Sequence, residues 1–392
     1  MSNPNSQKAG RHFLQIPGPS NVPDQILRAI AQPTIDHRGP AFADLTLGIL
    51  DKLVGVFNTQ SPIIIFPASG TGGWESSLLN TLSSGDKVLA FETGHFATLW
   101  KNVALKLGLD VIWVEGDWRH GIDSAVVEEH LRQDKEKSIK AVLAVHTETS
   151  SGATSDIKKI RQAIDAAAHP ALFMVDAVSS LACSEFRHDD WGVDVTISAS
   201  QKGLMLPPGL CFNAVSEKAL KAGESSGFQH SYWSWQEMLK LNQKGYFPYT
   251  PNTNLLYGLD EALNMLHSER MENVFLRHAK LAQATRLAVE GWGLEILCLN
   301  RDEYSNSTTA VVMPEGHDAD NMRDIILDRF NMSLGMGLGK VKGKVFRIGH
   351  IGDFNELMLA GTLSGVQMGL EVAGVPHNKD GVNAALDFLS AL

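Results

Sequence analysis

A lysine stands in an unusual place in the stretch SASQKGLMLPPG, residues 198–209. Lys202 follows the apolar run VDVTISAS, which is typical of a buried strand, and precedes a proline-stiffened apolar segment. Lysine is rarely buried, and burial disfavours its charged form and lowers its pKa. Such a lysine can act as a nucleophile toward carbonyl groups. The sequence therefore singles out Lys202 as a candidate for covalent chemistry.

A second candidate site follows the apolar run PIIIFPA. The segment SGTGG, residues 69–73, comes next, and a helical pattern begins near Trp74. Small residues let backbone N–H groups approach an anion, the hydroxyls of Ser69 and Thr71 add donors, and a helix N-terminus favours negative charge. The segment lacks the Gly-Lys-Ser/Thr ending of a P-loop, and Glu75 occupies the third glycine of the dinucleotide fingerprint. It is therefore either a phosphate cradle or a tight strand-to-helix turn.

Polar and aromatic residues follow three further apolar runs. Phe96 comes after KVLAF, Asp176 directly ends ALFMV, and His146, Glu148 and Thr149 come after KAVLAV. Taken singly, a phenylalanine here is more often core and a threonine more often a helix cap. Burying a carboxylate without a partner is costly, so Asp176 either caps a helix or holds a cation.

The elements that position these residues alternate along the chain. Between about residues 60 and 216, apolar runs alternate with segments of helical period, the runs being PIIIF, KVLAF, DVIWVE, KAVLAV, ALFMV, VDVTISA and LCFNAV. Most runs lack polar alternation, which is typical of a mainly parallel sheet covered by helices on both faces. Ligands of such sheets bind beyond the carboxyl ends of the strands, so we expect the candidate residues to share one edge.

Three regions are expected along the chain. The turn-rich residues 1–22 are predicted to form an N-terminal arm across the main domain. Residues 23–265 form the large α/β domain, and a long helical stretch over about 255–293 leads into a smaller C-terminal α/β domain over residues 266–392.

Composition argues against several classes of partner. The formal net charge of -10 and a pI near 5.8 give no basic patch for nucleic acid or an anionic membrane. Three widely spaced cysteines without a CxxC pair indicate neither a disulfide framework nor a zinc site, and we expect no metal. The N-terminus lacks the apolar core of a signal peptide, and no apolar run reaches membrane-spanning length. A cytoplasmic location is the resulting prediction.

One ligand suits all the candidates at the predicted sheet edge. Pyridoxal 5'-phosphate has a phosphate, a flat ring, a phenolic oxygen, a ring nitrogen that must stay protonated, and an aldehyde that condenses with lysine. The edge offers an anion cradle, an aromatic, a hydroxyl, a carboxylate and a desolvated lysine, in that order. We therefore predict this cofactor.

The chain also resembles a known family, the class V aminotransferases of fold type I, and within it the serine-glyoxylate and alanine-glyoxylate group. The resemblance spans nearly the whole chain. It rests on PGPSNVP (17–23), DHRGPAF (36–42), ASGTGGWE (68–75), VDAVSS (175–180), SQKGLMLPPG (200–209), YTPNTNLLYGL (249–259) and VFRIGHIG (345–352). It implies a mainly parallel seven-stranded sheet flanked by helices, a smaller C-terminal α/β domain, and a homodimer or a higher oligomer whose subunits share their active sites.

The resemblance implies a role for each matching residue. Lys202 is the lysine that condenses with the cofactor, and Asp176 is the partner of the ring nitrogen. Phe96 stacks on the ring, and Thr250 reaches the phosphate of the neighbouring subunit. The implied cofactor contacts are Ser69, Gly70, Thr71, Phe96, Thr149, Asp176, Val178, Gln201, Lys202 and Thr250. The implied substrate contacts are Arg347, which grips the carboxylate, Gly18 and Arg38. Alanine-glyoxylate members differ by carrying Trp in place of Phe96 and Tyr in place of Phe247.

The implied reaction moves an amino group from a small L-amino acid to glyoxylate and gives glycine and a 2-oxo acid. Serine is the first choice of donor, because TIDHR, GTGGWE and YTPNTNLLYGL look most like serine-glyoxylate sequences. A second cation at Arg38 would favour aspartate, although an arginine in a turn is the simpler interpretation; alanine is the third choice.

The sequence disfavours three other functions. Cysteine desulfurases share the fold and the cofactor, but residues 328–347 contain no loop cysteine, and Gln201 stands where desulfurases tend to show His. The missing fingerprint and Lys202 disfavour a nicotinamide-dependent oxidoreductase. A non-enzymatic binding protein comes last.

Overall fold

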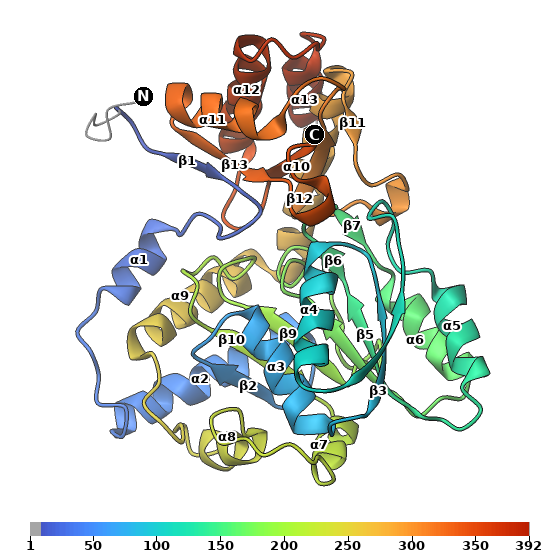
Figure 1. Ribbon diagram of the computed structural model, residues 1–392. Helices are drawn as coiled ribbons and strands as arrows, with labels where there is room; N and C mark the ends of the chain where they lie inside the picture. The colour runs from blue at the N-terminus through green and yellow to red at the C-terminus, as the bar shows by residue number, and fades with distance from the viewer. Residues whose placement is uncertain (1–8, 392) are drawn as a thin grey trace.

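Two sheets organise the chain in the computed structural model, which describes residues 9–391 (Figure 1). The larger sheet has seven strands, and β10 is antiparallel to both of its neighbours while the other adjacent pairs are parallel. In spatial order the strands are β2 (Ile63–Phe66), β10 (Cys211–Val215), β9 (Val195–Ala199), β8 (Leu172–Asp176), β5 (Ile139–Val145), β3 (Lys87–Phe91) and β4 (Asp110–Val114). Each predicted apolar run forms one of these strands, so the expected mainly parallel α/β fold is confirmed.

Helices cover both faces of this sheet. They are α1 (Asp24–Ile30), α2 (Pro40–Phe57), α3 (Gly70–Thr81), α4 (His95–Lys106), α5 (Ser124–Gln133), α6 (Ile157–Ala166), α7 (Glu217–Gly223), α8 (Trp235–Asn242) and α9 (Thr253–Glu269). A small hairpin, β6 (Thr147–Glu148) with β7 (Ala153–Thr154), lies beside the sheet edge where the candidate residues gather. α3 begins at Gly70, four residues before the helix start that the sequence predicted.

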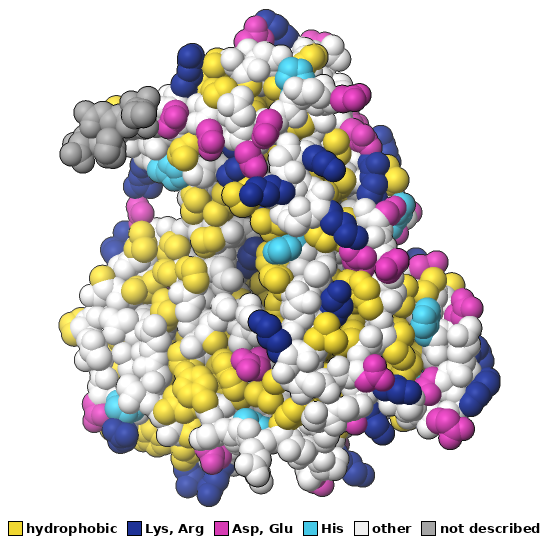
Figure 2. Space-filling model, in the orientation of Figure 1, with side chains coloured by type: hydrophobic (Ala, Val, Ile, Leu, Met, Phe, Trp, Pro, Cys, Tyr) yellow, Lys and Arg dark blue, Asp and Glu magenta, His cyan; other side chains and the backbone are white. Residues whose placement is uncertain are grey.

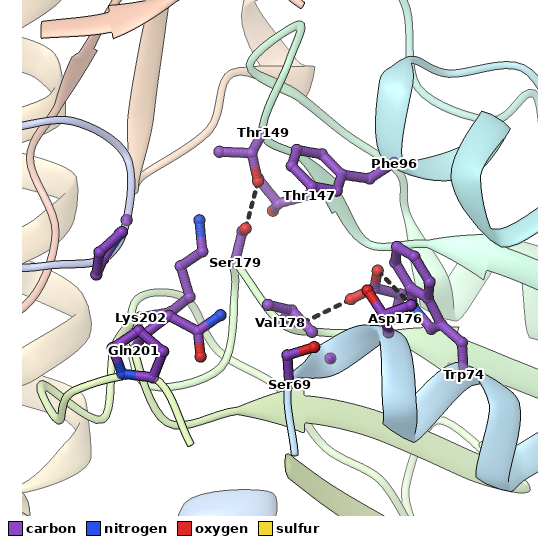
Figure 3. Close-up of a pocket in the computed structure, with 15 residues that line it drawn as sticks. Ser69, Trp74, Phe96, Thr147, Thr149, Asp176, Val178, Ser179, Gln201 and Lys202 are labelled. Carbon is purple, nitrogen blue, oxygen red and sulfur yellow. Dashed lines mark hydrogen bonds between the residues drawn. The ribbon is translucent and has the colours of Figure 1, made fainter. Parts of the chain in front are cut away.

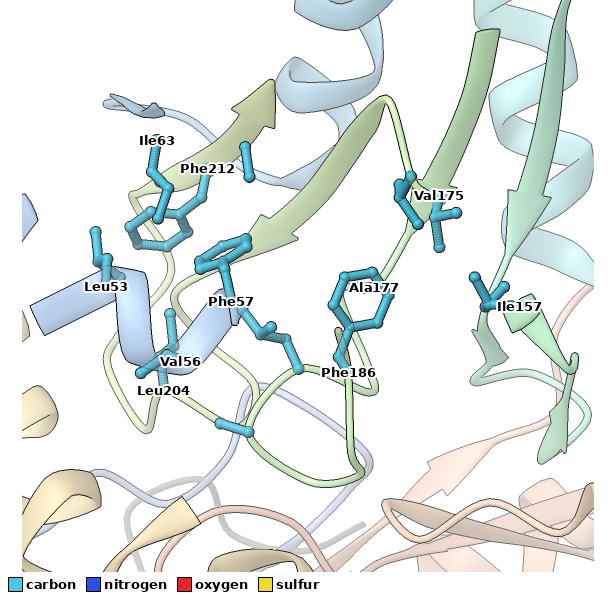
Figure 4. Close-up of a cluster of buried hydrophobic side chains, with 14 of the residues drawn as sticks. Leu53, Val56, Phe57, Ile63, Ile157, Val175, Ala177, Phe186, Leu204 and Phe212 are labelled. Atoms are coloured by element: carbon cyan, nitrogen blue, oxygen red, sulfur yellow. The ribbon is translucent and has the colours of Figure 1, made fainter. Parts of the chain in front are cut away.

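Successive strand residues enter two different cores, which explains why the strands are apolar throughout. Ile63 and Ile65 of β2 pack in the core with α2, α5, α6 and α9. Ile64 and Phe66 pack in the core with α3 and α4. Figure 4 shows part of the first core, where Leu53, Val56 and Phe57 from α2 meet Ile63, Phe212 and Leu204.

The smaller domain surrounds a five-stranded sheet in the order β1, β13, β14, β12, β11. Its elements are β1 (Phe13–Gln15), α10 (Met271–Gly291), β11 (Glu295–Ile296), η1 (Arg301–Glu303), β12 (Thr308–Val312), α11 (Ala319–Phe330), β13 (Met332–Met336), η2 (Gly339–Val341), β14 (Val345–Gly349), α12 (Glu356–Val372) and α13 (Gly381–Ser390). Helices α10 to α13 and the sheet share one core.

The N-terminal arm differs from its prediction. β1 pairs in parallel with β13, so this part of the arm belongs to the smaller domain's sheet rather than lying across the large domain. The following residues do reach the large domain, because the Ser20 N–H donates to the Gln201 carbonyl over 3.0 Å. The first eight residues of the predicted arm lie outside the described residues.

The predicted long helix is two helices. α9 ends at Glu269 and α10 begins at Met271, with Arg270 between them at a φ of +70°. The predicted domain boundary after residue 265 therefore falls inside α9, whose apolar side chains pack in the large domain. Among the described residues, no helix has the length and apolar content needed to cross a membrane.

Candidate active site

A cavity of about 260 Å³ lies at the carboxyl ends of β8 and β9 and the N-terminus of α3 (Figure 3). Its lining brings together ten of the predicted site residues, which come from six separate parts of the sequence. The lining consists of Gly18, Pro19, Ser69, Gly70, Thr71, Trp74, Phe96, Thr147, Thr149, Asp176, Val178, Ser179, Gln201, Lys202 and Pro208. The expectation that these side chains share one edge is therefore met.

The N-terminus of α3 supplies unpaired polar groups to this cavity. Ser69 is the N-cap residue, yet its side chain makes no capping hydrogen bond. Gly70 permits a close approach, since a Cβ there would lie 2.8 Å from Val178 Cγ2. The buried Gln201 Oε1 has no hydrogen-bond partner within the described chain. A helix N-terminus beside free hydroxyl and amide groups suits a phosphate.

Lys202 is buried at the opposite side of the cavity, with 7% of its surface exposed. Its Nζ donates a hydrogen bond to the carbonyl of Pro17. Burial, together with the nearby positive charge of Arg347, lowers the pKa of Lys202 to about 8. A substantial fraction of the amine is therefore neutral near physiological pH, which is the form that attacks a carbonyl.

The arm segment holds Lys202 closely. Ser20 Oγ donates to the Lys202 carbonyl over 3.0 Å. Gly18 has a φ of +115°, and a Cβ built there would collide with the Lys202 side chain. Only glycine satisfies both the backbone conformation and the contact.

Asp176 ends β8 and is buried, and no helix begins directly after it. Of the two alternatives for Asp176, the helix cap is therefore wrong. Its Oδ1 accepts from the Val178 N–H over 2.8 Å, and its Oδ2 accepts from Trp74 Nε1 over 3.0 Å (Figure 3). Burial raises the pKa of Asp176 to about 7, against the two hydrogen bonds, which lower it. A cationic partner next to this buried carboxylate would stabilise its ionised form.

Phe96 reaches the cavity from the first turn of α4, and Glu148 and Ser150 of the distant β6–β7 hairpin hold that turn. The N-cap residue, Gly94, offers no side chain. Instead the buried Glu148 accepts from the backbone N–H groups of Phe96 and Ala97, both over 3.1 Å. Its other oxygen accepts from the N–H and hydroxyl of Ser150 over 3.0 and 2.7 Å. The carboxylate therefore caps the helix and fixes the position of Phe96.

Two hydroxyls face the cavity between Phe96 and Lys202. Thr149 Oγ1 and Ser179 Oγ are hydrogen-bonded to each other (Figure 3). Val178 lies beyond Ser179 toward Asp176. The apolar side chains of Phe96 and Val178 therefore lie on either side of one part of the cavity, and Asp176 lies at the end of that part. A flat ring with a polar edge fits between them.

Three predicted residues lie outside the cavity lining. Arg347 on β14 is buried, and its Nε and Nη1 donate to the carbonyls of Met336 and Thr149 over 2.8 and 3.0 Å. Burial lowers its pKa to about 10. Thr250 and Arg38 are exposed. Arg38 lies in a turn, its backbone N–H donates to Asp36 Oδ1 over 3.0 Å, and within this chain it does not line the cavity.

Sequence reasoning missed two residues that organise the site. Trp74 reads as a core position of a helix, and nothing in the sequence announces its hydrogen bond to Asp176. Nothing in HTETSSG assigns a role to Glu148, since its partners at residues 96 and 97 are about fifty positions away. Within the described chain, no group of three or more His, Cys, Asp or Glu is placed to hold a metal ion.

The strand order, with a buried lysine and a buried carboxylate at neighbouring strand ends, defines the fold of the fold type I pyridoxal phosphate enzymes. The sequence profile of aminotransferase class V matches residues 13–337. A serine-glyoxylate aminotransferase of Methylorubrum extorquens is 48% identical over 98% of this chain and 97% of its own. An L-aspartate-glyoxylate aminotransferase of Paracoccus denitrificans is 42% identical over 92% and 91%. The chain belongs to the class V aminotransferase family.

A solved structure agrees with this assignment. The pyridoxamine-pyruvate aminotransferase from Mesorhizobium loti superposes with a TM-score of 0.92 at 26% sequence identity. The match covers 98% of this chain and 99% of the other. The resemblance identified from the sequence motifs is therefore confirmed over nearly the whole chain.

Proposed function

We propose that this protein is a pyridoxal 5'-phosphate-dependent transaminase that moves an amino group from serine to glyoxylate. The observation that carries the proposal is a pair of buried groups at one cavity. Burial lowers the pKa of Lys202 and raises the pKa of Asp176, whose ionised form a cationic partner would stabilise. The family assignment and the serine-glyoxylate relative support the reaction and the donor.

The chain offers a partner for each part of the cofactor. Ser69, Thr71 and Gln201 with the α3 N-terminus would hold the phosphate. Phe96 and Val178 would hold the ring, and Thr149 its phenolic oxygen. When bound, the cofactor supplies an aldehyde for the amine and a ring that takes up negative charge from the substrate carbon.

The protein's own groups would then handle protons and charge. Lys202 Nζ, as a neutral amine, takes the proton from the α-carbon of the donor and returns a proton later in the cycle. Asp176 stays ionised when a cation pairs with it, and so holds a proton on that partner. Arg347 would bind the carboxylate of each substrate in turn, because a planar guanidinium suits bidentate pairing.

A covalent trap tests the site. The chain is loaded with pyridoxal 5'-phosphate, reduced with borohydride and digested, and the labelled peptide is identified by mass spectrometry. We expect the label on Lys202 and no label in Lys202→Ala. A label elsewhere, or a chain that binds no cofactor, contradicts the proposal.

The donor is tested in half-reactions. Serine, alanine and aspartate are mixed separately with the cofactor-loaded enzyme, and conversion to the pyridoxamine form is followed by absorbance before glyoxylate is added. We expect serine to convert it fastest. Aspartate is the second candidate, because a relative at 42% identity is named an L-aspartate-glyoxylate aminotransferase. No response to any donor contradicts the transaminase proposal.

We also propose a homodimer in which Thr250 serves the neighbouring subunit. Beside it, Tyr249 stacks on Tyr232 at 4.4 Å between ring centroids, and Tyr232 is 44% exposed. On the face of the molecule drawn in Figure 2, hydrophobic side chains gather in the area where Figure 1 shows α2 and α8. Sedimentation should give twice the chain mass, and Thr250→Val should weaken cofactor binding. A monomer that binds cofactor fully contradicts this arrangement.

A further inference from the structure

We propose that Trp74 is a positioning residue, which fixes the orientation and charge of Asp176 for the reaction. The inference rests on the proposed function, since Asp176 matters through its cationic partner. Trp74 Nε1 donates to Asp176 Oδ2 over 3.0 Å, and the Val178 N–H donates to Oδ1 over 2.8 Å. With one donor on each oxygen, the carboxylate cannot rotate without breaking a hydrogen bond.

The Trp74 indole is itself held rigidly. Only 3% of the residue is exposed, and its ring stacks on Trp100 of α4 with centroids 6.0 Å apart and planes 13° from parallel. The helix lies close to the sheet at this point, because a Cβ on Gly73 would be 2.7 Å from Ile197 Cγ2 of β9. Packing therefore leaves the indole N–H little freedom to leave Asp176.

The position of Trp74 links the two ends of the proposed cofactor site. It lies four residues after Gly70, so it is one helical turn beyond the α3 N-terminus and on the same face. One rigid helix thus presents the phosphate cradle at its first turn and the Asp176 donor at its second. The distance between cradle and carboxylate is set within a single element, as precise positioning requires.

The charges around Asp176 show why a neutral donor matters. Burial and the negative charge of Glu148 raise the pKa of Asp176, whereas the Val178 and Trp74 hydrogen bonds and the charge of Lys202 lower it. Trp74 provides the only side-chain hydrogen bond to Asp176 among the described residues. Loss of that bond would raise the pKa of the carboxyl group further, and a protonated acid does not pair with a cationic ring nitrogen.

Trp74→Phe removes the donor and keeps an aromatic ring. In the apoprotein we expect the pKa of Asp176 to rise by about one unit, a tenfold change in its ionisation constant. The titration is followed by infrared difference spectroscopy, and Asp176→Ala identifies the carboxyl band. At pH 7 the dissociation constant for pyridoxal 5'-phosphate should rise by up to about tenfold. An unchanged titration and unchanged affinity would overturn the proposal.

Trp100→Phe is the matched control. Trp100 is the other ring of the stack, and its buried Nε1 has no hydrogen-bond partner in the described chain. The control variant therefore disturbs ring packing equally but leaves Asp176 with both donors. We expect no change in its titration or affinity. An effect as large as that of Trp74→Phe would assign the effect to packing and overturn the proposal.

A double-mutant cycle tests whether Trp74 acts through Asp176. In an Asp176→Ala background, Trp74→Phe should not weaken cofactor binding further; an undiminished loss there refutes the proposal. If Trp74→Phe does not fold, tryptophan indole ¹⁵N resonances of the unmodified chain serve instead. One indole N–H should titrate with Asp176 and none in Asp176→Ala, and the absence of any such resonance also refutes it. If the wild-type chain binds no cofactor, the proposed function is contradicted but the role of Trp74 is not. The titration of Asp176 in the apoprotein still tests that role.

Discussion

Replacing Glu148 by glutamine tests how the N-terminus of α4, and with it Phe96, is held. Glu148 is 0% exposed and accepts four hydrogen bonds, two on each oxygen. Glutamine has the same shape but only one accepting oxygen. Its amide hydrogens would therefore face either the backbone N–H groups of Phe96 and Ala97 or that of Ser150.

The magnitude follows from the number of donors left without an acceptor. A buried N–H group that loses its partner costs about 1–3 kcal/mol, and loss of a negative charge at a helix N-terminus costs a further ~0.3–1 kcal/mol. With one or two donors affected, we expect Glu148→Gln to reduce the free energy of unfolding by about 1–7 kcal/mol. Gly94 cannot compensate, because it has no side chain to replace the cap.

Urea unfolding of the apoprotein, followed by circular dichroism, measures this loss, and fluorescence titration measures the affinity for pyridoxal 5'-phosphate. Glu128→Gln on α5 is the control, since Glu128 makes an exposed pair with Arg132 at 2.6 Å that should contribute only about 0.5 kcal/mol. A loss below about 1 kcal/mol in Glu148→Gln, with unchanged affinity, would show that Glu148 does not hold this turn.

Three further predictions concern the groups at the cavity. Gly18→Ala should cost about 1–3 kcal/mol in backbone strain and also displace Lys202, so borohydride trapping of the cofactor should fail; Gly10→Ala, which has a φ of +82° and open space around it, should keep full trapping. Burial raises the pKa of Asp176 from 3.8 in the unfolded chain to about 7 in the apoprotein. Ionisation of Asp176 therefore lowers the free energy of unfolding as the pH rises from about 4 through 7, and below pH 4 it costs nothing. Asp176→Asn should therefore make the apoprotein more stable than wild type at pH 8, by up to about 4 kcal/mol, and no more stable at pH 4; thermal unfolding at both pH values checks this, and an equal difference at both would contradict it. Lys202→Ala should lower steady-state turnover by about 10³-fold or more, because covalent attachment and proton transfer are lost together; turnover within tenfold of wild type would exclude Lys202 from either role.

The sequence predicted the large domain well because its signals are local. Each strand was a continuous apolar run, and Lys202 and Asp176 are marked by standing at the ends of such runs. Since strand ends of a parallel sheet meet at one edge, the clustering around the cavity followed from order along the chain alone.

The parts that could not be predicted depend on contacts between distant residues. The pairing of β1 with β13 joins residues more than three hundred positions apart, and no local pattern in Phe13–Gln15 specifies its partner. The break at Arg270 lies within a continuous helical pattern, where tertiary packing overrides propensity. Trp74 and Glu148 looked like ordinary core and loop residues, because their roles depend on hydrogen bonds across the fold.

The pairing of β1 with β13 also covers an edge of the smaller sheet that could otherwise pair with a strand of another chain. The smaller sheet ends in β1 on one side and β11 on the other, and these strands have only three and two residues. Short outer strands offer a poor template for further pairing, whereas loss of β1 would uncover the edge of β13 at Met332–Leu334, where the two strands pair. Cleavage of the chain before Pro17 would release β1 and leave the edge of β13 unpaired. The cleaved protein should therefore aggregate even where its cavity is intact.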